Sequence, residues 1–345
     1  MAIQAASKEA GYPEFHELKR ADFISDQDVR WCPGCGDYSI LAQMQKVLPG
    51  LGVPKENIVF ISGIGCSSRF PYYVDTYGVH SIHGRALTLA TGLKTARPEL
   101  QVFVVTGDGD GLSIGGNHLL HTMRRNLDIV VVLFNNRIYG LTKGQYSPTS
   151  EFGKVTKSSP RGTTESPVNP LRVSLAARAT FVARSLDRDT RHLQTTLQQA
   201  AAHRGTSFVE VFQNCIIFND GAFDAFGDSD HRSERMLYIE EGQPLRFGKD
   251  RQHGVRLNGF RPEVVENAES DDGLLIHDPK NPDPIPAYIL AGMEYPDMPV
   301  PIGVFRNTEA PTYERLIEEQ IRDAQESNPA DLQALLNGTE TWQVD

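Results

Sequence analysis

The sequence contains few cysteines: Cys32, Cys35, Cys66 and Cys215 are the only four among its 345 residues. No apolar core of signal-peptide length stands near the start, so we expect a cytoplasmic protein with reduced thiols. The close pair Cys32 and Cys35 can belong to a zinc site, a thiol–disulfide couple or an iron–sulfur cluster, and the pair alone does not choose among them. Cys66 and Cys215, taken singly, have the ordinary interpretation of small buried hydrophobic residues.

The sequence also lacks a long hydrophobic run and an excess of positive charge. Its densest apolar stretch, residues 129–134 (IVVVLF), is far too short to span a membrane. The formal net charge of −10 argues against general binding to nucleic acid, whose phosphates attract clustered Lys and Arg side chains. We therefore expect neither a membrane nor a nucleic acid among the partners of this chain.

What the sequence does contain is a regular alternation of short apolar runs with helical patterns. The apolar runs predict buried strands at residues 57–62, 101–106, 128–134, 179–185 and 207–213. The helical patterns lie at residues 37–48, where Asp37 is expected to cap the helix, and at 85–98, 111–126, 171–178 and 189–205. This alternation is typical of an α/β fold with a doubly wound, mostly parallel sheet.

The composition divides the chain into three parts. Residues 1–30 are polar and are expected to form an N-terminal arm, and residues 31–220 contain the alternating pattern of the core. Beyond residue 220, prolines, glycines and charges dominate, and periodicity stays weak until a helical pattern at 314–325. We expect residues 221–345 to form an irregular C-terminal extension that packs on the core and on a partner subunit.

Unusual residues follow several of the predicted strands. The sequence GIGC follows the first, GDGD the second and NN the third, while Cys215 comes shortly after the last. In open parallel sheets, ligands collect at the carboxyl ends of the strands. We therefore expect these four segments to face one crevice, with the cysteines close by.

The acidic glycine segment after the second strand suggests a diphosphate bound through magnesium. The segment matches neither a calcium-binding EF-hand loop nor the P-loop nor the GxGxxG dinucleotide fingerprint. Gly107 and Gly109 would let the backbone approach a phosphate, and Asp108 is a hard oxygen ligand of the kind that Mg²⁺ prefers. A second oxygen ligand is expected one crossover later, at Asn135 or Asn136.

These motifs together resemble a known family. GDGD followed by NNRIYG resembles the thiamine-diphosphate motif. With WCPGCG, GIGCSSRF, HGRALTLATGLK and NNRIYGLTKGQYSPTS, the stretch from about residue 30 to 220 is similar to the β subunits of 2-oxoacid:ferredoxin oxidoreductases. Among these it looks most like the bacterial 2-oxoglutarate branch.

The resemblance implies three bound groups. Asp108, the Asn136 side chain and the Ile138 carbonyl would hold Mg²⁺. Thiamine diphosphate would be lined by Ile64, Gly65, Cys66, Ser67, Gly109, Asp110, Gly140 and Leu141, with His83 near its diphosphate. Cys32, Cys35, Cys66 and Cys215 match the four cluster cysteines of the family and would bind one [4Fe–4S] cluster. Four thiolates also suit zinc, so spacing alone leaves that alternative open.

The resemblance also implies a reaction and partners. The reaction would be the reversible oxidative decarboxylation of 2-oxoglutarate with coenzyme A, giving succinyl-CoA, CO2 and reduced ferredoxin. An α subunit would supply the activating glutamate in an (αβ)2 assembly, and Arg69 is a candidate for contact with the distal carboxylate of the substrate. The alternatives are an enzyme for pyruvate or for a broad range of 2-oxoacids, and a non-redox thiamine-dependent lyase with a structural zinc.

Overall fold

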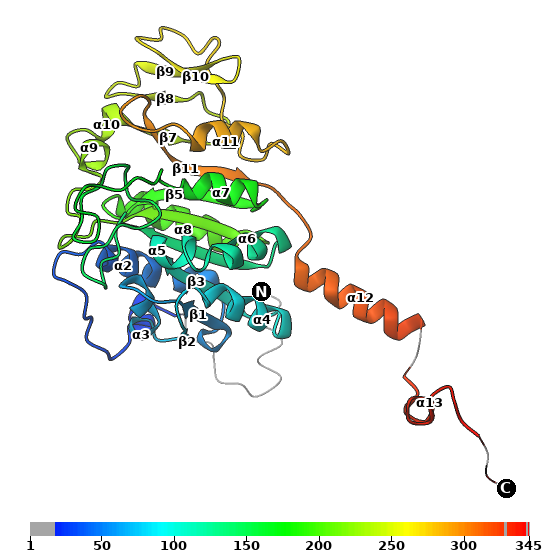
Figure 1. Cartoon of the computed structure of the whole chain (residues 1–345). Helices are drawn as coiled ribbons and strands as arrows, with labels where there is room; N and C mark the ends of the chain where they lie inside the picture. Colours follow the sequence, from blue (N-terminus) through cyan, green and yellow to red (C-terminus); the bar gives the residue numbers. More distant parts are fainter. Residues whose placement is uncertain (1–17, 328–329, 343, 345) are drawn as a thin grey trace.

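The computed structural model describes residues 18–327, 330–342 and 344, in which helices cover both faces of a central sheet (Figure 1). The sheet has eight strands in the order β2-β1-β3-β4-β6-β5-β11-β7. They are β1 (Ile58–Ser62), β2 (Tyr77–His80), β3 (Gln101–Gly107), β4 (Ile129–Asn135), β5 (Phe181–Leu186), β6 (Ser207–Phe212), β7 (Met236–Ile239) and β11 (Val300–Asn307). Strands β1 to β6 run parallel, whereas β11 is antiparallel to β5. The predicted mostly parallel α/β sheet is confirmed.

Helices α2 and α8 cover one face of this sheet, and α4, α6, α7 and α11 cover the other. The bounds of the longer helices are α2 (Asp37–Val47), α4 (Ala86–Ala96), α6 (Gly116–Arg125), α7 (Pro170–Ala176), α8 (Thr190–Ala202) and α11 (Ile285–Ala291). Shorter helical segments are α3 (Phe70–Tyr73), α5 (Asp108–Leu112), α9 (Asp224–Gly227) and α10 (Arg232–Arg235).

The hydrophobic core lies in two layers, one on each face of the sheet. In β3, Val102 and Val104 pack toward α4 and α6, while Phe103 and Val105 pack toward α2. All residues of β4 are buried. A strand that is buried on both faces reads in sequence as a continuous apolar run, which explains why residues 128–134 predicted it so clearly.

The sheet extends beyond the boundary that the sequence suggested at residue 220. Strands β7 and β11, both from the last third of the chain, join its edge next to β5. Between them, β8 (Arg246–Phe247), β9 (His253–Asn258) and β10 (Arg261–Val265) form a separate antiparallel sheet, at the top of Figure 1. Strand β11 contains a proline and a glycine, which interrupt the apolar pattern and concealed the strand in the sequence.

Two helix starts differ from the predictions. Asp37 does not cap α2 but is its first residue, and it is buried, while the N-cap position is taken by Gly36. The GDGD segment is not a turn before a helix at residue 111, because α5 begins at Asp108 and α6 begins separately at Gly116. Thr106 Oγ1 donates to Asp110 Oδ2 at 2.7 Å, which ties the first turn of α5 directly to the end of β3.

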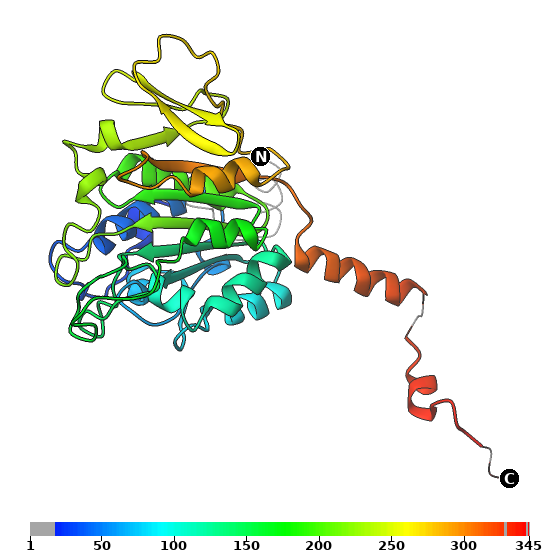
Figure 2. The ribbon, with the colours of Figure 1, turned by 45° about the horizontal axis from the view of Figure 1, so that its top comes forward.

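The C-terminal residues form an arm that leaves the body of the molecule (Figures 1 and 2). It contains α12 (Tyr313–Ser327), which the pattern at 314–325 predicted, and α13 (Leu332–Asn337). Of the expected N-terminal arm, residues 1–17 lie outside the described residues, and the remainder includes a short 3-10 turn at Arg20–Phe23. Across the described ranges, no helix combines the length and the apolar character needed to cross a membrane.

Candidate functional site

The carboxyl ends of four neighbouring strands form one edge of the sheet. Strands β1, β3, β4 and β6 are adjacent and parallel, so the segments GIGC, GDGD and NN and the segment leading to Cys215 all start from this edge. The long connection at residues 136–169, which contains no regular helix or strand, also leaves from here. A connection of this length in a compact fold is typical of a functional loop.

A cleft lies between these strand ends. Its lining includes most of the residues expected for thiamine diphosphate and Mg²⁺: Ile64, Gly65, Cys66, Ser67, Asp108, Gly109, Asp110, Asn136, Ile138, Gly140 and Leu141. It also includes Asp37 and Tyr139, which were not among the residues expected to line the site. His83 is the expected residue outside this lining, but it contacts the cleft residue Asp110, with 2.7 Å between His83 Nδ1 and Asp110 Oδ1.

Asp108, the expected magnesium ligand, is buried at the start of α5. Burial raises the pKa of this carboxyl to about 6, although hydrogen bonds from Ser147 and Thr149 act in the opposite direction. Both hydroxyls contact the same carboxylate oxygen, Asp108 Oδ2, at 2.5 and 2.6 Å. Binding of a divalent cation would remove the destabilisation that burial imposes on the charged form.

The other two expected magnesium ligands lie on a tight turn after β4. Arg137, between them, adopts a left-handed backbone conformation with φ of 57°. Asn136 Oδ1 accepts a hydrogen bond from the Ile138 N–H at 3.2 Å, and Asn136 Nδ2 donates to Gln213 Oε1 at 2.9 Å. The Gln213 contact requires the Asn136 amide to direct its nitrogen toward Gln213, which directly follows β6, and this leaves the amide oxygen on the side of Ile138.

Asp110 holds two loops of the cleft together. Its Oδ1 atom accepts hydrogen bonds from the Ile64 N–H at 3.1 Å and the Gly84 N–H at 2.7 Å, in addition to its contact with His83. A side chain at Gly63 would overlap this carboxylate. Asp110 therefore lines the cleft as expected, but its carboxylate binds to groups of the protein and holds the loops at Ile64 and Gly84 in place.

Gly109 allows the ring of Tyr139 to pack directly on α5. A Cβ atom at Gly109 would overlap this ring, and the Tyr139 hydroxyl donates to the Gly109 carbonyl at 2.9 Å. The side chain of Tyr139 thus fixes the 136–169 loop against the residues that follow β3.

If the cleft binds thiamine diphosphate as the sequence leads us to expect, we predict that Gly109→Ala will displace Tyr139 and lower the affinity for this cofactor by about 10-fold or more, because the loop carries residues expected to bind it. Calorimetric titration of the cofactor-depleted enzyme with thiamine diphosphate and Mg²⁺ measures this. Gly116→Ala is the matched control, since Gly116 is also helical and has open space around its Cβ position. Equal affinities of the two variants would contradict the prediction.

The four cysteines line a second cavity, of about 230 Å³, beside the cleft. The two cavities share Cys66, Asn136, Gly140 and Leu141. A Cβ atom at Gly140 would lie 3.6 Å from both Cys66 Sγ and Cys215 Sγ, so a side chain there would occupy the space between the two sulfurs. Cys66 follows the end of β1, Cys215 follows the end of β6, and Cys32 and Cys35 lie in the loop that precedes α2. The fold brings these three segments together.

Burial disfavours the charged thiolate form of three cysteines in this cavity, Cys35, Cys66 and Cys215. Burial, followed by the carboxyl of Asp37, raises the pKa of Cys66 to about 12 and also raises the pKa of Cys35. Burial likewise raises the pKa of Cys215, against which the backbone N–H groups of Phe218 and Ile217 act. Binding of a metal group would therefore release protons from these cysteines.

The four cysteines line one cavity, and their residue type suits either a [4Fe–4S] cluster or zinc. Among the described residues, no three His, Cys, Asp or Glu side chains converge closely enough to hold one metal ion. The expected [4Fe–4S] cluster requires all four cysteines at one place, and the cavity brings them there.

Arg69 lies at the cysteine cavity and not in the lining of the cleft. It ends the short 3-10 segment that follows Cys66. Arg30 and Lys143 line the same cavity. Three cationic side chains therefore surround the cysteines, which suits either an anionic cluster or an anionic group bound next to it.

Asp37 is a cleft residue whose burial the sequence did not indicate. Its Oδ2 atom is buried without a hydrogen-bond partner among the described residues. Burial and the nearby carboxyl of Asp187 raise the pKa of Asp37 from 3.8 to about 7. The sequence predicts that the Asp37 carboxyl caps a helix. The structure instead places this carboxyl in the lining of the cleft, near Cys35.

We predict that Asp37→Asn will stabilise the cofactor-depleted enzyme at pH 8 but not at pH 4. The pKa of Asp37 is higher in the folded protein than in the unfolded chain, so its contribution to stability is present below about pH 4 and is lost as pH rises through about 7. Calorimetric melting temperatures at the two pH values test this, with about 2–4 °C expected for each kcal/mol gained. An equal shift at both pH values would contradict it.

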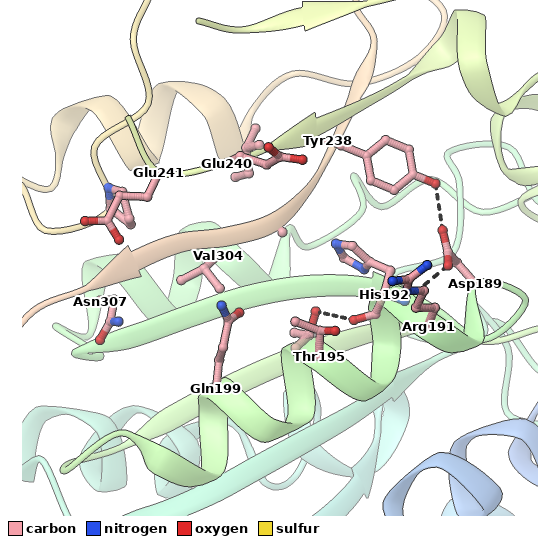
Figure 3. Close-up of a pocket in the computed structure, with 14 residues that line it drawn as sticks. Asp189, Arg191, His192, Thr195, Gln199, Tyr238, Glu240, Glu241, Val304 and Asn307 are labelled. Carbon is pink, nitrogen blue, oxygen red and sulfur yellow. Dashed lines mark hydrogen bonds between the residues drawn. The ribbon is translucent and has the colours of Figure 1, made fainter. Parts of the chain in front are cut away.

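Another cavity, of about 430 Å³, lies between α8 and strands β7 and β11 (Figure 3). Its most buried acidic residue, Asp189, accepts hydrogen bonds from the Tyr238 hydroxyl at 2.7 Å and from the His192 N–H at 3.2 Å. Asp189 thereby caps α8 and contacts β7. None of the residues expected to bind a cofactor lines this cavity. The polar groups of Asp189, Tyr238 and His192 form hydrogen bonds with one another that hold α8 against β7.

Comparison with known proteins identifies a family match over much of the chain. Residues 63–211 match the family described as "Thiamine pyrophosphate enzyme, C-terminal TPP binding domain". The chain is 52% identical to the 2-oxoglutarate oxidoreductase subunit KorB of Mycobacterium tuberculosis, over 98% of this chain and 92% of the relative. It is 36% identical to a 2-oxoacid:ferredoxin oxidoreductase subunit beta of Saccharolobus solfataricus, over 87% of this chain and 89% of that one.

A solved structure shows the same overall fold. The 2-oxoglutarate:ferredoxin oxidoreductase from Magnetococcus marinus, with 2-oxoglutarate, coenzyme A and succinyl-CoA bound, is similar with a TM-score of 0.75 and 34% sequence identity. The similarity covers 94% of this chain and 97% of that chain. It therefore includes the last third of the chain, which the sequence motifs left unmatched.

Proposed function

This chain belongs to the β subunits of the 2-oxoacid:ferredoxin oxidoreductases, and on that premise we propose that it works with an α subunit to decarboxylate 2-oxoglutarate oxidatively with coenzyme A. The products would be succinyl-CoA, CO2 and reduced ferredoxin. The names of the Mycobacterium tuberculosis relative and of the Magnetococcus marinus structure support 2-oxoglutarate as the substrate. The main structural support is that the cleft and the cysteine cavity share four lining residues.

In this proposal the cleft holds thiamine diphosphate through Mg²⁺. The Asp108 carboxylate, Asn136 Oδ1 and the Ile138 carbonyl would be the protein ligands, since Mg²⁺ prefers hard oxygen atoms. His83 is oriented by Asp110 and would contact the diphosphate with its other ring nitrogen. Thiamine diphosphate supplies the electron sink that decarboxylation of a 2-oxoacid requires.

The cysteine cavity would hold one [4Fe–4S] cluster through Cys32, Cys35, Cys66 and Cys215. Such a cluster transfers electrons one at a time, as reduction of a ferredoxin requires. Cys66 lines both cavities, so the cluster would lie directly beside the thiamine cofactor. The backbone N–H groups after Cys215 would donate to its sulfur and stabilise the thiolate.

The proposal requires partners. We expect the glutamate that activates the aminopyrimidine of thiamine on the α subunit, in an (αβ)2 assembly located in the cytoplasm. The apolar side chains of Leu141 and Ile217, both more than half exposed, stand beside the cysteine cavity together with Lys143. This surface would be covered by the α subunit or approached by ferredoxin. Arg69 is the candidate in this chain for contact with the distal carboxylate of the substrate.

The test is anaerobic co-purification with the α subunit, followed by assays of electron-acceptor reduction with coenzyme A and several 2-oxoacids. We expect a clear preference for 2-oxoglutarate. A clear preference for pyruvate would refute the substrate assignment. Decarboxylation that needs no electron acceptor, by a protein that contains zinc and no iron, would indicate a non-redox thiamine-dependent lyase instead.

A further inference from the structure

A buried group of hydroxyl and amide side chains surrounds Asp108 on the side of the 136–169 loop. Ser147 and Thr149, both from this loop, donate hydrogen bonds to Asp108 Oδ2 at 2.5 and 2.6 Å. Ser147 and Thr149 are each 3% exposed, and Asp108 is 2% exposed. Two donors on a single carboxylate oxygen fix the rotation of the carboxylate group, and bonds to a charged acceptor are the strong ones.

Thr149 has a second acceptor on its other side. Its Oγ1 atom lies 2.9 Å from Asn135 Oδ1. Asn135 is oriented by a buried ion pair, because Asn135 Nδ2 donates to Glu210 Oε1 at 2.7 Å and Arg184 Nε contacts Glu210 Oε2 at 2.6 Å. An ionised Glu210 only accepts, so the Asn135 amide must direct its nitrogen to Glu210 and its oxygen to Thr149.

The Thr149 hydroxyl proton therefore lies between two acceptor oxygens. A charged carboxylate is a stronger acceptor than an amide oxygen, so the proton is donated to Asp108. Without the hydroxyl, Asp108 Oδ2 would keep only the Ser147 donor, and the buried carboxylate would be less firmly held.

We propose that Thr149 is a positioning residue for the magnesium ion: its hydroxyl, with that of Ser147, holds the Asp108 carboxylate in the orientation that presents it to the metal. This inference rests on the proposed function, which makes Asp108 a magnesium ligand. It assigns a role to the loop sequence SPTS (147–150), which the thiamine motif itself does not include.

The inference predicts the effect of Thr149→Val, which keeps the shape of the side chain and removes its hydroxyl. The measurement uses the complete enzyme from which Mg²⁺ has been removed and to which saturating thiamine diphosphate has been added. In this enzyme the Kd for Mg²⁺ should rise about 10- to 100-fold, the usual effect of removing a group that orients a metal ligand. Calorimetric titration with Mg²⁺ measures it. Activity should return at high Mg²⁺ concentration, since the ligand itself is present.

Three further variants separate positioning from general damage. Thr149→Ser should restore the Kd to within about threefold of wild type, and Ser147→Ala should weaken Mg²⁺ binding as Thr149→Val does. Thr163→Val, in the same loop, removes a buried hydroxyl that donates to the Glu151 carbonyl at 2.9 Å, and should leave the Kd unchanged. A wild-type Kd in both Thr149→Val and Ser147→Ala would overturn the inference. A wild-type enzyme that binds no thiamine diphosphate with Mg²⁺ would overturn the proposed function itself.

Discussion

Replacement of Cys35 by alanine in the complete enzyme is expected to remove the visible absorption of the proposed [4Fe–4S] cluster and to reduce the iron content from about four atoms per chain to background. Cys35 lines the cysteine cavity but not the neighbouring cleft. A cluster that loses one of its four thiolates is expected to be lost, and ferredoxin reduction would then fall by at least about 1,000-fold. Iron analysis, visible spectra and acceptor assays on anaerobic preparations measure these effects.

The same variant provides its own control, because the proposed site of thiamine diphosphate and Mg²⁺ is the neighbouring cleft. Their affinity should stay within a few fold of wild type in Cys35→Ala, and Cys215→Ala should behave in the same way. A protein that keeps its iron after both substitutions would show that the cysteines are not the cluster ligands.

Replacement of Asp108 by asparagine is expected to lower the Mg²⁺ affinity by at least about 100-fold and to abolish turnover. Asparagine keeps the shape of the side chain but removes the charged oxygen, so the loss should exceed the 10- to 100-fold typical of a residue that only orients a ligand. In the wild type, Mg²⁺ affinity should fall below about pH 6, where protons compete for the Asp108 carboxylate. Calorimetric titrations at several pH values test both statements.

Asp128→Asn is the matched control for this substitution. Asp128 forms ion pairs with Lys94 at 3.2 Å and Arg204 at 2.9 Å, before the start of β4 and at the opposite edge of the sheet from the cleft. Its replacement should lower the melting temperature without changing the Kd for Mg²⁺. If the two variants bind Mg²⁺ equally well, Asp108 is not a ligand.

Most of the parallel sheet could be predicted from sequence because its central strands are buried on both faces. The parallel edge strand β2, whose four residues are all exposed, has no apolar run and was missed. The largely apolar runs of β1, β3, β4 and β6 indicated both the strands and the positions where they end. The last third could not be predicted in this way, since β11 contains a proline and a glycine and pairs with β5, far away in the sequence. Local periodicity contains no information about such a pairing.

The sequence motifs located the candidate site, but the side chains that support its residues could be identified only from the three-dimensional structure. Asp108, Asn136 and the cysteines stand in recognisable patterns, whereas Thr149 and Glu210 lie 14 and 75 residues from their common neighbour Asn135. Asp37 had the sequence signature of a helix cap and became a buried carboxyl of the cleft. Burial and long-range contacts, not residue type, decide what such side chains do.

The most direct test of the central claim is the response of the cluster to substrate in the anaerobic enzyme. If the four cysteines hold a [4Fe–4S] cluster beside thiamine diphosphate, adding 2-oxoglutarate and coenzyme A should bleach the visible absorption and produce the electron paramagnetic resonance signal of a reduced cluster. The Asp108→Asn enzyme should keep its cluster and show neither change. An unchanged cluster spectrum in wild-type enzyme that decarboxylates 2-oxoglutarate would contradict the account.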